Sequence, residues 1–501
     1  MKFTSTRNSG IHVESAYTIA KGISDEGGLF VPETIPGFGE GELAELSKLD
    51  YIGRAKAVFA KYLTDYTDEE ISDALRSAYG NGKFENDIPD QLVKLTGGPY
   101  MLELWHGSTC AFKDVALQIL PHLLTKAVQK TGGVKETVIL VATSGDTGKA
   151  ALEGFRDVDG TRIIVFYPSD GVSAMQKLQM STQTGNNVAV CAVKGNFDDT
   201  QTAVKKIFTD SGVKALLAEQ GKAFSSANSI NFGRLLPQIV YYVSAYCTML
   251  ADGEIAPGEK INYTVPTGNF GNILAAYYAK HMGVPVNKLI CASNSNNVLT
   301  DFLRTGRYNK NRNFYTTASP SMDILISSNL ERLLYLLTDC NDKAVSGFME
   351  ELQESGEYRV PDSVLASLRD EFDAGWCDDD DAGKSIKSAF AEYSYLLDTH
   401  TAVAMRVYEE YAGRTGDATK TIIASTANPY KFPRAVLGAI GLPVPDDDFE
   451  AAEKLFEVSR QPIPEQLRRL KEAKVRFADV IDREDMRSFV LSTVLSTGGE
   501  A

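Results

Sequence analysis

Residues 261–276 read Ile261-Asn262-Tyr263-Thr264-Val265-Pro266-Thr267-Gly268-Asn269-Phe270-Gly271-Asn272-Ile273-Leu274-Ala275-Ala276, an apolar run, a glycine-bearing loop and a second apolar run. This order predicts a buried strand, a loop and the start of a helix. Gly268 and Gly271 allow close approach of a ligand to the backbone, and the free amides at a helix N-terminus favour an anion such as a phosphate. The GxxG spacing does not meet the GxGxxG dinucleotide fingerprint. Taken alone, the loop is therefore either a phosphate cradle or a tight strand-to-helix turn.

Strand, loop and helix patterns alternate through most of the chain after Thr137. Short β-branched runs end in loops of Gly, Ser, Thr or Asn, and they predict strands at 137–142, 163–167, 188–193, 261–265, 289–292 and 421–424. Parallel strands joined by helical crossovers have this pattern. The sequence therefore predicts an α/β fold, in which ligands gather outside the carboxyl ends of the strands.

Three other regions depart from this alternation. Residues 1–95 contain amphipathic patterns that predict helices at 46–60 and 69–77, and we interpret them as an N-terminal accessory domain. The strand signal fades between about residues 325 and 411, which predicts a largely helical insertion. Residues 436–501 carry charge-rich helical patterns and are interpreted as a C-terminal helical arm.

Composition argues against several classes of protein. The 501 residues carry a formal charge of −15 without a basic cluster, so nucleic acid is not expected as a partner. The six cysteines include no CxxC pair and the five histidines no HExxH motif, so neither a disulfide framework nor a metal site is favoured. We interpret the acidic run from Asp378 to Asp381 as a solvated turn. Because no apolar leader and no apolar window of about 18 residues is found, we expect a cytoplasmic protein that does not enter a membrane.

A lysine follows an apolar run in His106-Gly107-Ser108-Thr109-Cys110-Ala111-Phe112-Lys113-Asp114. Burial among small and aromatic neighbours would lower the pKa of Lys113, which suits its amine to form a Schiff base. A lysine beside an aspartate is more often a solvated surface pair. The choice between these interpretations depends on the loops elsewhere in the chain.

Two further strand ends carry polar loops. Residues 143–148, Thr143-Ser144-Gly145-Asp146-Thr147-Gly148, lack the spacing of a P-loop and would either receive a carboxylate or phosphate or cap the helix that follows. The strand at 421–424 delivers Ser425 and Thr426 at its carboxyl end. A Schiff-base lysine, an anion cradle and a hydroxyl for a ring nitrogen together match what pyridoxal phosphate (PLP) requires.

With these motifs in place, the chain resembles the threonine synthases, which are fold type II PLP enzymes of the tryptophan synthase β family. The resemblance is carried by Ser5-Thr6-Arg7, by residues 22–32 and 228–238, and by the motifs above, so it extends over nearly the whole chain. It implies two open, mostly parallel sheet domains flanked by helices, in addition to the N-terminal domain. The large PLP-binding domain would comprise residues 96–130 and 246–435, and the smaller one residues 131–245. The insertion and the arm are similar to those of the longer form of the enzyme.

The resemblance also implies roles for individual residues. Lys113 would hold PLP as a Schiff base and shuttle protons, and Thr426 would bond the ring nitrogen. The cofactor phosphate would be bound by Gly268, Asn269, Phe270, Gly271 and Asn272. The substrate carboxylate would be held by Ser144, Gly145, Asp146 and Thr147. Arg234 is the first candidate for binding the substrate phosphate and Arg7 the second, while Lys149 departs from the family pattern.

The implied reaction converts O-phospho-L-homoserine and water into L-threonine and phosphate, by γ-elimination of phosphate and addition of water at Cβ, in a monomer or homodimer. One alternative is another fold type II PLP lyase, such as a serine/threonine dehydratase or a phospho-lyase. A second is a cofactor-free binding protein that merely keeps the fold. Such a protein would be expected to have lost Lys113 or the Gly268 loop, and both are present.

Overall fold

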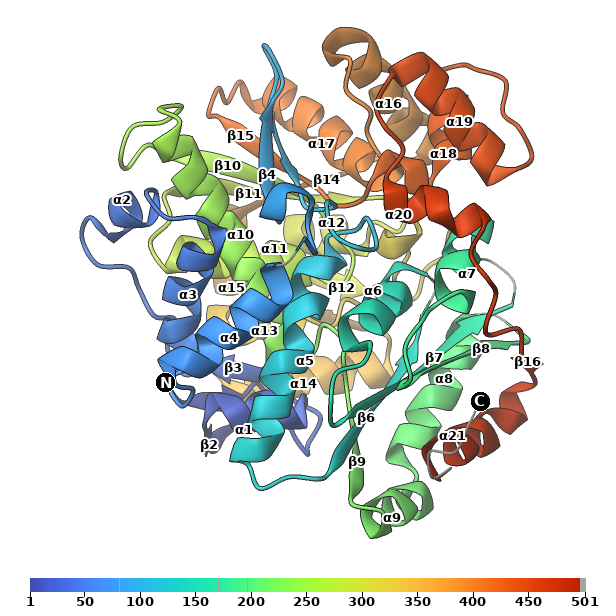
Figure 1. Cartoon of the computed structure of the whole chain (residues 1–501). Coiled ribbons are helices and arrows are strands. Elements are labelled where there is room, and N and C mark those ends of the chain that lie inside the picture. The colour runs from blue at the N-terminus through green and yellow to red at the C-terminus, as the bar shows by residue number, and fades with distance from the viewer. Residues whose placement is uncertain (81, 144, 170–171, 196, 496–501) are drawn as a thin grey trace.

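The computed structural model describes residues 1–80, 82–143, 145–169, 172–195 and 197–495 (Figure 1). Within these residues, the larger sheet has the strand order β14-β11-β10-β15-β5-β4 and the smaller one β16-β8-β7-β6-β9. Neighbouring strands in both sheets run parallel, apart from β4, which pairs antiparallel with β5. The predicted fold, two open and mostly parallel sheets flanked by helices, is therefore confirmed.

The strands of the larger sheet are β4 (Gln91–Lys94), β5 (Tyr100–Glu103), β10 (Ile261–Pro266), β11 (Val286–Ser293), β14 (Phe372–Trp376) and β15 (Thr421–Ser425). Those of the smaller sheet are β6 (Glu136–Ala142), β7 (Thr161–Pro168), β8 (Val188–Val193), β9 (Lys222–Ser225) and β16 (Val480–Ile481). Three strands near the N-terminus form an antiparallel sheet, β1 (Phe3–Ser5), β2 (Asn8–Val13) and β3 (Phe30–Pro32), and β12 (Arg307–Asn309) pairs with β13 (Glu357–Arg359).

The helices fall into four groups along the chain. The N-terminal region has α1 (Ser15–Lys21), α2 (Glu42–Leu46), α3 (Tyr51–Tyr62) and α4 (Asp68–Tyr79). Next come α5 (Lys113–Lys130), α6 (Asp146–Phe155), α7 (Ala174–Ser181), α8 (Phe197–Thr209), α9 (Ser211–Glu219), α10 (Phe232–Ala251) and α11 (Gly271–His281). They are followed by α12 (Val298–Thr305), α13 (Leu330–Leu337), α14 (Asp342–Glu354), α15 (Asp362–Glu371), α16 (Asp379–Tyr393), α17 (Thr399–Thr415) and α18 (Pro433–Ala439). The C-terminal region has α19 (Asp448–Ser459), α20 (Glu465–Arg468) and α21 (Met486–Leu495).

The six strands predicted from the sequence are all present, with ends that differ by at most three residues, but one predicted helix needs correction and two regions predicted as helical also contain a strand. The helix predicted at 46–60 is two helices, α2 and α3, because the Asp50 side chain accepts a hydrogen bond from Gly53 N at 2.8 Å and caps α3. Most of the segment 325–411 is helical, and it also contributes β14 to the edge of the larger sheet. The C-terminal arm likewise contributes β16 to the smaller sheet. Both strands are too short or too poor in β-branched residues to give a periodic signal.

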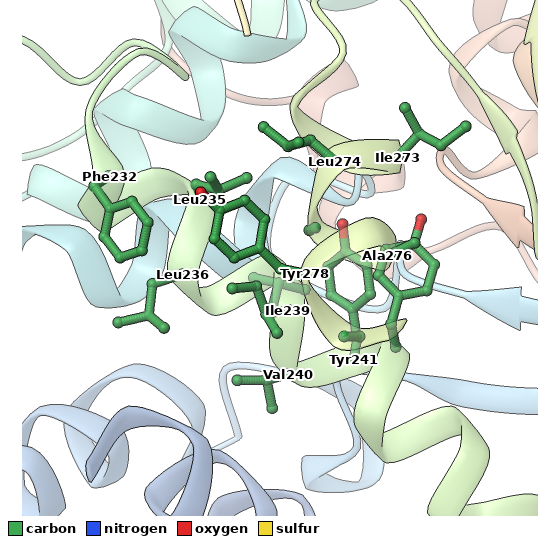
Figure 2. Close-up of a cluster of buried hydrophobic side chains, with 14 of the residues drawn as sticks. Phe232, Leu235, Leu236, Ile239, Val240, Tyr241, Ile273, Leu274, Ala276 and Tyr278 are labelled. Carbon is green, nitrogen blue, oxygen red and sulfur yellow. The ribbon is translucent and has the colours of Figure 1, made fainter. Parts of the chain in front are cut away.

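Helix α10 lies in the hydrophobic core and packs against α3, α5 and α11. Its side chains are buried around most of its circumference, as expected for a helix without a solvent face. Figure 2 shows part of this cluster, in which Leu235 and Ile239 of α10 lie near Tyr278 of α11. Each large apolar side chain buried in this way stabilises the fold by roughly 1.5–3 kcal/mol.

The carboxyl ends of four parallel strands lead into the motifs singled out above. β10 leads into the Gly268 loop, β15 into Thr426, β6 into the Thr143 loop, and β5 into the segment that ends at Lys113. The N-terminal region is in contact with one of these segments, because α1 and α4 pack against α5, the helix that begins at Lys113. Among the described residues, no helix is long and apolar enough to cross a membrane.

Candidate active site

Lys113 is the first residue of α5 and is only 8% exposed. Its Nζ donates a hydrogen bond to Oγ of Ser321 at 3.1 Å and lies 3.6 Å from Oδ2 of Asp146. Burial lowers the pKa of Lys113, and the charges of Lys431 and Arg234 lower it further against the opposing effect of Asp146. These surroundings favour the neutral, nucleophilic amine, so the surface-pair interpretation of Lys113 and Asp114 does not hold.

Asp114 points back into the lysine motif instead. Its carboxylate accepts hydrogen bonds from N and Oγ1 of Thr109 at 2.8 and 2.6 Å. An added Cβ at Gly107 would lie 2.7 Å from Cβ of Asp114. The first turn of α5 therefore holds the loop that precedes Lys113, and a side chain at residue 107 would disturb it.

A buried cation, Lys431, compensates the charge of Asp146. The Nζ of Lys431 lies 2.7 Å from Oδ1 of Asp146 and donates to the carbonyl of Thr109 at 2.9 Å. Burial by itself would raise the pKa of Asp146, but Lys431 and Lys113 outweigh that effect and the pKa is lowered. Gln176 adds a hydrogen bond to the same carboxylate at 2.9 Å. Asp146 is therefore an anion that already has partners, and its side chain would repel a substrate carboxylate.

Thr426 lies across from the lysine motif. The amide of Phe112 donates to the carbonyl of Thr426 at 2.9 Å, and the amide of Asn428 donates to the carbonyl of Cys110 at 3.1 Å. Ala111 and Ala427 form the bridge between these two bonds. This pairing places Thr426, which is 5% exposed, beside the residue that precedes Lys113.

The Gly268 loop is connected to the lysine through Ser321, which belongs to the short 3-10 helix Pro320–Met322. An added Cβ at Gly268 would lie 2.8 Å from the carbonyl oxygen of Ser321, so only glycine fits at this position. Ser327 Oγ donates to the carbonyl of Gly268 at 2.8 Å. Phe270 has a positive φ of 62°, a left-handed conformation that turns the chain into α11.

The N-terminus of α11 has donors that suit an anion. Its N-cap residue is Phe270, and none of the described side chains caps the helix there. The Oδ1 atom of Asn272 accepts hydrogen bonds from the hydroxyls of Tyr241 and Tyr242 at 2.5 and 2.7 Å. Its Nδ2 is buried and has no acceptor in the described part of the chain. A glycine cradle, a free helix N-terminus and an orphaned donor fit a phosphate group.

The loop after β6 is organised by Thr143. Its Oγ1 accepts hydrogen bonds from the amides of Gly145 and Gly148 at 3.0 and 2.9 Å. Gly145 has a φ of 146°, which L side chains rarely adopt. Thr147 is half-buried in the first turn of α6, whereas the predicted Ser144 lies outside the described residues. The neighbouring Lys149 pairs with Glu153 of α6 at 3.5 Å and donates a hydrogen bond to Gln183, which follows α7, so its charge already has partners.

The two candidate arginines have different environments. Arg234 is buried at the start of α10, where its Nη1 donates to the carbonyl of Ala227 at 2.6 Å. Its Nε finds no acceptor among the described residues, and burial lowers the pKa of Arg234 to about 10. Arg7 binds the carboxylate of Glu331 with Nε at 2.8 Å and Nη2 at 2.7 Å. Arg234 therefore has unused hydrogen-bonding capacity near Lys113, whereas the charge of Arg7 is compensated.

Ser321 and Lys431 are site residues that the sequence analysis missed. Ser321 lies within no motif and is 208 residues from Lys113 in the chain. Lys431 follows Thr426 by five residues, so the polar strand end at Ser425 and Thr426 was the one signal that pointed near it. Residues that contact the site from distant parts of the chain leave no local pattern in the sequence.

Comparison with known families defines the class of protein. The model described as "Pyridoxal-phosphate dependent enzyme" matches residues 91–426, which include Lys113, the Gly268 loop and Thr426. Models for the threonine synthase N terminus and the threonine synthase C-terminal region match residues 2–79 and 401–490. The chain belongs to the threonine synthase family of PLP-dependent enzymes.

Individual relatives agree with this assignment. Threonine synthase of Pseudomonas aeruginosa is 38% identical in an alignment that covers 87% of this chain and 90% of the relative. Human threonine synthase-like 1 is 40% identical over 84% of this chain, and the match spans 57% of the length of that relative. The crystal structure of PLP-bound threonine synthase from Brucella melitensis is 34% identical, with a TM-score of 0.88 and coverage of 99% of both chains.

Proposed function

We propose that this protein is a threonine synthase, a PLP-dependent lyase that converts O-phospho-L-homoserine and water into L-threonine and phosphate. The observation that carries the proposal is the position of Lys113. Its buried amine, with a lowered pKa, contacts Ser321 beside the Gly268 loop, and the preceding residue pairs with Thr426, in a chain of this family. PLP, when bound, supplies an electron sink that acidifies the Cα and Cβ protons of an amino-acid substrate.

The residues of the chain would divide the binding work. Lys113 would hold the cofactor covalently, and Thr426 would offer its hydroxyl to the ring nitrogen. The cofactor phosphate would lie at the N-terminus of α11, against the amides of Gly268, Asn269, Phe270 and Gly271 and the Nδ2 of Asn272. The orphaned state of that Nδ2 supports this placement. Because Thr426 is neutral, the ring nitrogen would stay largely unprotonated.

Substrate would occupy the space between the two sheets. The amide of Thr147, with Ser144, would hold its carboxylate at the start of α6, while the amide of Gly145 stays bonded to Thr143. We assign Asp146 a different role from the one implied by resemblance, since its carboxylate is paired with Lys431 and would orient Lys113 rather than bind an anion. Arg234 would face the substrate phosphate, because its Nε has no acceptor among the described residues and its guanidinium lies close enough to affect the pKa of Lys113.

The amine of Lys113 would also move protons. A neutral Nζ can accept protons from Cα and then from Cβ of the substrate, and it can return protons at Cγ, once phosphate has left, and at Cα. The hydroxyl of Ser321, 3.1 Å away, would orient the amine lone pair during this transfer. Because the site is buried, it would exclude bulk water. The water molecule that adds at Cβ would therefore be one bound within the site.

The deciding experiment incubates the purified protein with PLP and O-phospho-L-homoserine and measures threonine and phosphate together. Equal amounts of the two products support the proposal. Release of phosphate with a 2-oxo acid would instead identify another fold type II lyase. Absence of any PLP absorbance after incubation with the cofactor would revive the interpretation as a cofactor-free binding protein.

A further inference from the structure

The N-terminus of α17 carries a buried hydrogen-bonded group that is separate from the motifs described above. Asp398 is the N-cap residue of α17, and its carboxylate accepts hydrogen bonds from the amides of His400 and Thr401 at 2.8 and 3.3 Å. The same carboxylate also binds both side chains, Nδ1 of His400 at 3.0 Å and Oγ1 of Thr401. Helix capping requires the two amide bonds but not the two side-chain bonds. The additional pair of contacts therefore calls for another explanation.

The first side chain, His400, leads to Lys113. Nε2 of His400 accepts the amide hydrogen of Ser321 at 3.2 Å, and Oγ of Ser321 accepts the hydrogen bond of Lys113 Nζ. Because Nε2 accepts, it must be unprotonated, so Nδ1 carries the proton that is donated to Asp398. The ring is 3% exposed and packs against Phe432, with the ring centroids 5.2 Å apart. His400 is therefore held in one tautomer and one orientation.

The second side chain, Thr401, leads to the opposite end of the site. Its Oγ1 donates to Asp398 and accepts the amide hydrogen of Thr426 at 3.3 Å. Thr401 is fully buried, and Asp398 is 1% exposed. One carboxylate thus binds the two side chains that hold Ser321 and Thr426 in place.

We propose that Asp398, His400 and Thr401 are positioning residues that set the separation between Lys113 and Thr426. Asp398 acts through His400 on Ser321, and thereby on the Lys113 amine and the Gly268 loop, and through Thr401 on Thr426. The inference rests on the proposed use of Lys113 and Thr426 to hold PLP. A set of contacts that links these residues through one carboxylate would keep the cofactor ring at a constant distance from the lysine.

Matched substitutions test this inference through the affinity of the apoprotein for PLP, measured by fluorescence titration without substrate. His400→Leu and Thr401→Val remove an acceptor and are expected to raise the Kd about tenfold. His400→Gln offers an amide oxygen to the Ser321 amide, and Thr401→Ser keeps the hydroxyl, so both should stay within about threefold of the parent. If each conservative variant binds PLP as weakly as its partner, or if all four bind like the parent, the inference is overturned.

A measurement on the unsubstituted protein is independent of variant folding. The chain has five histidines, so ¹⁵N-histidine labelling and two-bond ¹H–¹⁵N correlation spectra resolve each ring, with His400 assigned by its absence in His400→Gln. The proton on Nδ1 is expected, and a proton on Nε2 would contradict the proposal. The Kd for PLP and the tautomer of His400 are both measured without catalytic turnover. A protein that passes these tests but makes no threonine would therefore contradict the proposed function and leave this inference intact.

Discussion

The Nζ of Lys431 lies 2.7 Å from Oδ1 of Asp146, while the other oxygen of that carboxylate lies 3.6 Å from Nζ of Lys113. All three side chains are buried. Two lysines thus share one aspartate, and the shorter contact belongs to Lys431. The consequence is that the negative charge is compensated mainly by Lys431, which leaves Lys113 free to be neutral.

Lys431→Met should raise the pKa of Lys113, because it removes a neighbouring positive charge and leaves Asp146 to pair with Lys113. A rise of one pKa unit would lower the rate at which the apoprotein binds PLP covalently at neutral pH about tenfold. The pH dependence of that rate, followed by absorbance, measures the shift. Lys431→Arg keeps the charge and should retain most of the parent profile. An unchanged midpoint in Lys431→Met would show that Lys431 does not control the lysine.

Lys113→Ala should lower threonine formation by at least about 10³-fold, because it removes both the covalent attachment and the proton-transferring amine. Borohydride treatment followed by peptide mass analysis should find the reduced cofactor on Lys113 of the parent protein. Lys149→Ala is the matched control, since Lys149 is a half-buried lysine whose pKa is likewise lowered by burial, but it faces Glu153. Full turnover by Lys113→Ala would end the proposal of threonine synthase activity.

Gly268→Ala should raise the Kd for PLP about tenfold or more, because the new Cβ would lie 2.8 Å from the carbonyl of Ser321 and 3.3 Å from Cα of Met322. Both contacts are with backbone, so the loop itself must move. In contrast, an alanine Cβ at Gly347 of α14 would meet no atom within 4 Å among the described residues. Gly347→Ala should therefore bind PLP normally and stabilise its helix by roughly 0.5–1 kcal/mol. Fluorescence titration measures the Kd for PLP of each variant, and thermal melts measure its stability.

The pH dependence of stability should reflect His106. Burial alone would lower its pKa, but Glu103 and Glu85, which bond its two ring nitrogens at 2.7 and 2.8 Å, raise it to about 9. A raised folded-state pKa means that the stabilisation is fully present below about pH 6.5, the unfolded value, and is lost as pH rises to about 9. The Tm of the parent should therefore fall more between these pH values than the Tm of His106→Gln. If the Tm of the two proteins changed with pH in the same way, His106 would not be protonated in the folded state.

Much of the fold followed from local sequence patterns. The strands β6, β7, β8, β10, β11 and β15 were predicted because β-branched runs ended by glycine or polar loops are signals that each segment carries itself. The edge strand β14, Phe372-Asp373-Ala374-Gly375-Trp376, has little intrinsic β preference and forms because β11 offers it a parallel partner. The two-residue strand β16 likewise exists through its pairing with β8.

The amino-acid sequence specified the α/β class, and it predicted the groups that we propose bind PLP, namely Lys113, the Gly268 loop and Thr426, because glycine spacing and strand-end polarity are local properties. Tertiary structure decided what surrounds them. It brought Ser321 to the lysine amine, gave Asp146 a cation in Lys431, and joined Lys113 to Thr426 through Asp398. The physical reason is that burial and hydrogen bonding between distant segments set a pKa and an orientation, and these exist only once the two sheets are packed together.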